Sequence, residues 1–100
     1  MKAKLLCVAA ATIATAGALA AESTIELKAG PGRDLVRGYC VACHSLDYVQ
    51  ANAPFMTRQV WDAEVAKMIK AYGAQVPADD VPKLVDYLAS AYGVAPPAPK

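Results

Sequence analysis

The feature that most constrains this 100-residue chain is the run Cys40-Val41-Ala42-Cys43-His44. It holds the only histidine of the sequence and two of its three cysteines. On a helix, positions i, i+3 and i+4 share one face. We therefore expect two thiols and one imidazole to project together from a single helical turn.

Two cysteines separated by two residues and followed directly by histidine are typical of covalent haem c attachment. Cys40 and Cys43 would add to the two vinyl groups of one haem, and His44 would bind its iron through Nε2. A zinc site needs four ligands, which this motif does not supply. A thioredoxin-like site expects a βαβ setting, and a plain disulfide leaves the adjacent histidine unexplained.

Residues 1–20 have the layout of a secretory signal peptide. Two lysines precede an apolar run at 5–13, and small residues at 18–20 prepare a cut just before or after Ala21. The run is shorter than the roughly 20 apolar residues that a membrane span requires. We therefore expect export to the periplasm and no membrane insertion.

Cleavage of this leader would remove Cys7 together with two lysines. Eight basic residues would then remain against nine acidic ones, so the mature chain would be almost neutral. No run of basic residues indicates binding to nucleic acid or to a lipid surface.

Three segments place apolar residues at helical spacing, and we find no strand pattern. The first runs from Arg33 to about His44, behind the breaker at 30–32, and Gly38 within it would permit a close approach of another element. Residues 45–56, which include Pro54, are expected to form a loop.

The second helix is expected from Arg58 to Tyr72, with Thr57 as its N-cap and Gly73 as its C-cap. The third is expected to start at a cap formed by Asp79 or Asp80, to tolerate Pro82 in its first turn, and to end at Gly93. The apolar faces of these two helices are carried by Trp61, Val65, Met68, Ile69 and Tyr72, and by Val81, Leu84, Val85, Leu88 and Tyr92.

The expected organisation is a signal peptide (1–20), an N-terminal arm (21–31), one all-α domain with a covalent haem (32–93) and a proline-rich tail (94–100). About three helices in roughly 80 mature residues make a thin core, and domains of this size usually need a staple such as a cofactor. The apolar surface of one haem would provide it.

The iron would need a second axial ligand, and two methionines of the mature chain can supply the sulphur. Met56 follows His44 closely, in or just after the expected loop, where little chain remains to reach the far side of a haem. Met68 lies twice as far from His44 along the chain, on the apolar face of the second helix. We favour Met68 as the ligand; Met56, and a site without a protein ligand, are the alternatives.

A methionine on an apolar face ordinarily packs in the core, and the expected cofactor is what favours ligation here. Ligation by histidine and methionine raises the reduction potential and leaves no coordination position for a substrate. It therefore predicts an electron carrier with no catalytic residues.

Two hypotheses concern the surroundings of the haem. A backbone carbonyl at Pro54 would accept the Nδ1–H of His44, unless Pro54 is a simple loop proline. Trp61 and Arg58 would bind a haem propionate, unless they are ordinary core and surface residues.

Taken together, these residues resemble class I cytochromes c. The resemblance rests on Gly32, Leu35, Val36, the Cys40–His44 motif and the terminal helix at 84–88. It is closer to the small monohaem cytochrome c subunit of bacterial sulfite dehydrogenase (sulfite:cytochrome c oxidoreductase). Its stretches cover most of residues 30–93, at 40–49 (CVACHSLDYV), 52–55 (NAPF), 61–74 (WDAEVAKMIKAYGA) and 85–93 (VDYLASAYG).

The resemblance implies a small fold whose first and last helices cross near the haem edge. It implies that Met68, in a Trp-x-x-x-Val-x-x-Met pattern, is the distal iron ligand. It also implies a heteromer with a molybdenum-cofactor subunit, which oxidises sulfite and passes electrons singly to the haem. A downstream acceptor, such as another cytochrome c or an oxidase, would follow.

Two other functions stay open. A free-standing shuttle cytochrome would relay electrons between several respiratory partners. A small haem enzyme or gas-binding protein would keep the distal side open.

Overall fold

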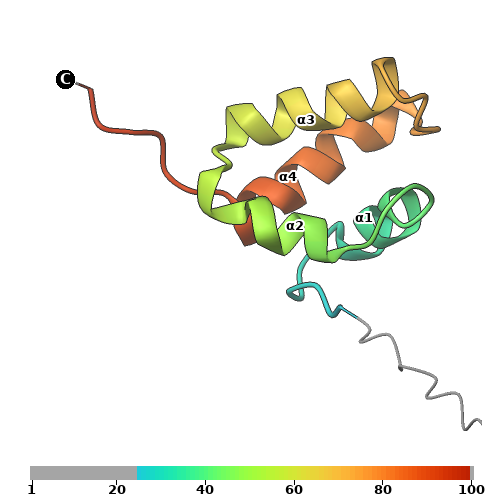
Figure 1. The fold of residues 1–100 in the computed structure, drawn as a ribbon, viewed down its shortest axis with the longest axis horizontal. Helices are drawn as coiled ribbons and strands as arrows, with labels where there is room; N and C mark the ends of the chain where they lie inside the picture. The colour runs from blue at the N-terminus through green and yellow to red at the C-terminus, as the bar shows by residue number, and fades with distance from the viewer. Residues whose placement is uncertain (1–24, 100) are drawn as a thin grey trace, which may run out of the picture.

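The structure is a computed structural model that describes residues 25–99. The expected signal peptide and Cys7 lie outside the described residues. Within them the chain is all-helical, as predicted, and contains no strand (Figure 1). The elements in chain order are α1 (Arg33–Cys40), α2 (Asp47–Asn52), η1 (Ala53–Phe55), α3 (Arg58–Lys70), η2 (Ala78–Asp80) and α4 (Val81–Tyr92).

Helix α1 begins where Gly32 lets it lie against α4. Gly32 has φ 91°, in the left-handed region that favours glycine, and its carbonyl accepts the Val36 amide at 3.1 Å. A Cβ at Gly32 would lie 2.9 Å from the Tyr87 Cβ and 3.0 Å from the Lys83 carbonyl. The close approach therefore occurs at Gly32, whereas Gly38 has no other part of the chain within 4 Å of such a Cβ.

Helix α1 ends at Cys40 rather than near His44, and residues 41–43 form a turn. The Cys43 amide lies 3.5 Å from the Cys40 carbonyl, at the limit of a hydrogen bond. Both Val41 and Cys43 are exposed. Because packing rather than propensity stabilises most protein helices, these exposed residues do not support another helical turn.

The expected loop at 45–56 contains the short helix α2 and the 3₁₀ turn η1. Leu46 and Val49, three residues apart, are buried in the core and give α2 an apolar face. Pro54 lies in the first turn of η1, where the missing N–H costs nothing. The spacing of Leu46 and Val49 is the sequence signal for this helix. Pro54 instead favoured the prediction of a loop.

Helix α3 starts at Arg58 as the sequence predicts, but it ends at Lys70, two residues before the predicted Tyr72. The Thr57 Oγ1 accepts the Val60 amide at 3.3 Å, which is the expected N-cap. After Lys70 the chain turns and reaches Gly73, with φ 74°, whose amide donates to the Ile69 carbonyl at 3.2 Å. This is the left-handed termination that glycine permits at a helix end.

Helix α4 packs against both α1 and α3 and supplies the largest part of the core. Its buried side chains are Leu84, Val85, Tyr87, Leu88 and Tyr92. Pro82 lies in its first turn, and Gly93 follows its last residue, as expected. Asp80 precedes the helix, but its carboxylate binds the Tyr39 hydroxyl and the Lys83 ammonium instead of capping the backbone.

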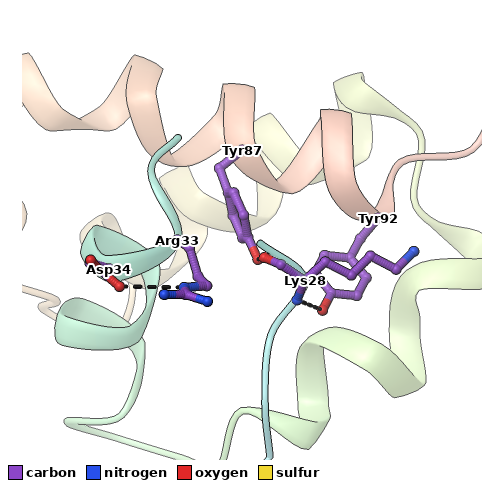
Figure 2. Close-up of polar contacts among 5 residues, drawn as sticks. All are labelled: Lys28, Arg33, Asp34, Tyr87 and Tyr92. Atoms are coloured by element: carbon purple, nitrogen blue, oxygen red, sulfur yellow. Dashed lines mark hydrogen bonds and ion pairs between the residues drawn. The ribbon is translucent and has the colours of Figure 1, made fainter. Parts of the chain in front are cut away.

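The described part of the N-terminal arm packs on α4. Leu27 is buried, and the Lys28 amide donates to the Tyr92 hydroxyl at 2.8 Å. The Tyr87 hydroxyl donates to the Lys28 carbonyl at 2.6 Å (Figure 2). Burial, the main cause, raises the pKa of Tyr87 to about 12, so the hydroxyl keeps its proton at neutral pH. Tertiary contacts therefore order a segment that sequence periodicity left irregular.

The described tail, 94–99, has no helix and leads away from the bundle (Figure 1). Its first amide, at Val94, donates to the Met56 carbonyl at 2.9 Å. Over residues 25–99, no helix combines the length and the apolar character needed to cross a membrane.

Candidate functional site

A cavity of about 490 Å³ lies among the end of α1, the face of α3 and the middle of α4. It brings together all four residues that the sequence singled out: Cys40, Cys43, His44 and Met68. They come from two segments, one ending α1 and one on α3. A second hollow of about 590 Å³, between the starts of α3 and α4, holds none of these four residues.

The two cysteines differ in exposure although they line the same cavity. Cys40 is the last residue of α1 and is half-buried, whereas Cys43 lies in the turn and is exposed. Both are free thiols. Burial, and secondly the neighbouring Cys43, raise the pKa of Cys40, so its thiol stays protonated at neutral pH.

The imidazole of His44 is half-buried, and one of its ring nitrogens has a hydrogen-bond partner. Its Nδ1 lies 3.0 Å from the carbonyl of Ser45, the next residue. When Nδ1 carries the proton and donates to that carbonyl, Nε2 keeps a free lone pair that can bind a metal. The hypothesis that Pro54 accepts this hydrogen bond is therefore wrong in this structure: the partner is local, because the turn after Cys43 brings the Ser45 carbonyl to the ring.

The two candidate methionines occupy different places. Met68 is half-buried on α3 and lines the cavity. Met56 is only 7% exposed, belongs to the hydrophobic core and does not line the cavity. Only Met68 therefore shares a cavity with His44.

The remaining walls are mainly apolar and come from α3, α4 and the segment between them. The aliphatic lining residues are Val65, Ile69, Val76, Leu84 and Leu88. Ligand sites in proteins usually measure about 300–1,000 Å³ and are lined mostly by apolar groups with a few placed polar ones. Two thiols, an imidazole and a thioether in such a cavity fit a covalently attached haem.

One edge of the cavity is polar, and sequence reasoning missed it. Glu64 and Lys67 form an ion pair of 2.7 Å, and this hydrogen bond raises the pKa of Lys67. Tyr48 and Tyr72 line the same cavity. Tyr72 had been placed on the apolar face with Met68, whereas Glu64 had not; Glu64 lies four residues before Met68, so helical spacing from Met68 is the signal that would have found it.

Neither Trp61 nor Arg58, the two residues expected near a propionate, lines the cavity that holds His44. Trp61 is buried, and its Nε1 has no hydrogen-bond partner among the described residues. Arg58 lines the second hollow and pairs with Asp86. Trp61 thus keeps an unsatisfied donor, whereas Arg58 lies away from the cavity that holds His44.

Tyr39, another lining residue missed at the sequence level, ties α1 to the start of α4. Its hydroxyl donates to Asp80 Oδ2 at 2.8 Å, and Lys83 Nζ donates to Asp80 Oδ1 at 2.8 Å. The hydrogen bond from Lys83, followed by that from Tyr39, holds the pKa of Asp80 below its ordinary value. This network links Tyr39, a lining residue of the cavity on α1, to the start of α4.

Comparison with known proteins adds no relative: no protein-family model matches the chain, and no curated protein matches it. Across residues 25–99, no group of three or more His, Cys, Asp or Glu side chains is placed to hold a metal ion. The geometry of the cavity is thus the basis for assigning a function.

Proposed function

We propose that this chain is an exported, periplasmic electron-transfer protein that carries one covalent haem c in the cavity of Cys40, Cys43, His44 and Met68. The observation that carries the proposal is the presence of these four side chains around one apolar cavity. The attachment motif is local in sequence, but Met68 lies on a different helix, α3, and only folding brings it there.

Haem iron held by histidine and methionine exchanges single electrons and has no free coordination position. Cys40 and Cys43 would hold the haem: each thiol would add across one vinyl group, so that the S–H bond and the C=C π bond would break while C–S and C–H bonds form. With its proton on Nδ1, His44 would donate to the Ser45 carbonyl, and this hydrogen bond would orient Nε2 as the iron-binding atom. Leu84 and Leu88, both buried, would give the bound haem apolar contacts on the side of α4.

The proposed partner is a molybdenum-cofactor subunit that oxidises sulfite, in a heteromer that hands its electrons to this haem. Support comes from the stretches at 40–49, 61–74 and 85–93, which resemble the cytochrome subunit of sulfite dehydrogenases. Adding sulfite to the complex purified from its native source should reduce the haem. Purification of the chain alone, with electron exchange among several partners, would instead indicate a free shuttle.

The cofactor is tested by the mass of the mature chain. We expect the mass of a chain starting near Ala21 with one haem added, and loss of that haem when Cys40→Ala and Cys43→Ala are combined. Cys7→Ala is the matched control, because Cys7 would leave with the signal peptide and the haem should remain. A mature chain with unmodified cysteines would contradict the proposal.

A further inference from the structure

The chain holds its second methionine in a separate, well-defined place. Met56 is buried, its amide donates to the Ala53 carbonyl at 3.2 Å, and its carbonyl accepts the Val94 amide at 2.9 Å. Met56 thus has both backbone polar groups bonded and its thioether in the core.

The bond from Val94 differs from the other loop and cap bonds of the described residues. Within the part of the chain that the structure describes, it is the one backbone hydrogen bond outside the helices whose partners lie far apart in the sequence. The other bonds of this segment, Met56 to Ala53 and Val60 to Thr57, are local. Val94 therefore ties the turn before α3 to the end of α4.

We propose that the Val94 N–H to Met56 carbonyl bond is a positioning contact that keeps Met56 in the core and so reserves the distal iron position for Met68. This inference rests on the proposed haem function. It explains why Met68 rather than Met56 would bind the iron. The contact acts through Met56: it adds to the burial of the side chain the one backbone bond that ties this residue to a distant segment, so its loss makes it easier for the thioether to leave the core for the iron.

A proline at position 94 removes the donor N–H. Gly93, the preceding residue, has φ −72° and ψ 145°, a conformation that residues before proline readily adopt. Ala95→Pro is the matched control, since it adds a proline to the same tail and keeps the Val94 amide. Both changes are made in the full-length, haem-loaded chain that also carries Met68→Ala.

With Met68→Ala alone, we expect the iron to bind imidazole from solution and to lack the weak near-infrared band of ferric iron bound to thioether sulphur. Adding Val94→Pro should weaken imidazole binding, by up to about five-fold for the loss of one typical backbone hydrogen bond, because Met56 then competes. The thioether band should return and disappear again with Met56→Leu. Ala95→Pro should change neither readout.

A second measurement does not involve the iron. Mild peroxide converts accessible methionine to its sulfoxide. In the haem-loaded chain that retains Met68, Met56 should be oxidised faster with Val94→Pro than with Ala95→Pro, as read from peptide masses. If the Val94→Pro chain fails to take up haem, a chain that ends at Gly93 replaces it, because it lacks the same N–H donor. Its imidazole affinity, thioether band and Met56 oxidation are then measured in the same way.

Equal imidazole affinities and equal oxidation rates for the Val94→Pro and Ala95→Pro chains would overturn the inference. A thioether band that persists with Met68→Ala alone would also overturn the inference, because Met56 would then bind the iron without any loss of the Val94 contact. The proposed haem function would not be affected by that result. A mature chain without covalent haem is recognised from its mass beforehand and overturns the proposed function itself.

Discussion

Met56 and Met68 carry the same thioether, yet the fold gives them different surroundings. Met68 shares a cavity with His44, whereas Met56 lies in the core beneath the tail. The longer sequence separation from His44 favoured Met68 as the ligand. The structure agrees with this choice, because Met68 lines the cavity and Met56 does not. A single side chain is therefore expected to set the electronic properties of the site.

Met68→Ala should lower the reduction potential and open the iron to external ligands, because a thioether ligand raises the potential. Redox titration and carbon monoxide binding to the reduced protein measure the two effects. The control is Met56→Ala, which should cost about 2–5 kcal/mol of stability through a core cavity but leave the potential almost unchanged. An unaltered spectrum and potential in Met68→Ala would exclude Met68 as the ligand.

At the scale of the helices, the crossing of α1 and α4 depends on one glycine. Gly32 combines a positive φ with a position where a Cβ would meet Tyr87 and the Lys83 carbonyl. Sequence analysis assigned the close approach to Gly38, inside the helix, because no sequence signal reveals which face of α1 meets α4.

Gly32→Ala should lower the free energy of unfolding by about 1–3 kcal/mol, since it adds an overpacked contact and a strained left-handed residue. Gly38→Ala is the matched control. Its Cβ meets no other part of the chain, and it should stabilise α1 by about 0.5–1 kcal/mol through helix propensity. Urea unfolding of both variants gives the comparison, and a Gly32→Ala chain as stable as Gly38→Ala would rule out the close contact.

At the scale of the whole molecule, a few long-range polar contacts join segments that the sequence predicted only as separate parts of the chain. Tyr87 and Tyr92 fix the arm at Lys28 (Figure 2), and Val94 fixes the tail at Met56. Asp80 joins α1 to the start of α4 through Tyr39. In a domain with so small a core, we expect such contacts to help fix the positions of the helices that line the cavity.

The Asp80 network predicts a loss of stability in acid. The folded pKa of Asp80 lies below its ordinary value of 3.8, so the stabilisation is present above pH 3.8 and is lost as the pH falls through the folded pKa. Urea midpoints measured from pH 6 to pH 2.5 should fall less steeply for Asp80→Asn. Asp79→Asn, an exposed neighbour, should follow the unsubstituted chain, and identical slopes for all three would contradict the prediction.

The sequence by itself determined the features that depend on chemistry within about one helical turn. Helical spacing placed α3 and α4, Thr57 capped α3 through its own hydroxyl, and Gly73 ended it with a left-handed turn. The Cys40–His44 motif belongs to the same class, because its three side chains lie within five residues of the chain.

Tertiary structure decided which of these elements meet. It ended α1 at Cys40, ordered α2 on the core through Leu46 and Val49, and brought Met68 but not Met56 to His44. These outcomes depend on contacts between residues far apart in the chain. Such contacts depend on which apolar faces pack together. The local spacing of apolar residues predicts that a face exists, but it does not predict which other face it packs against.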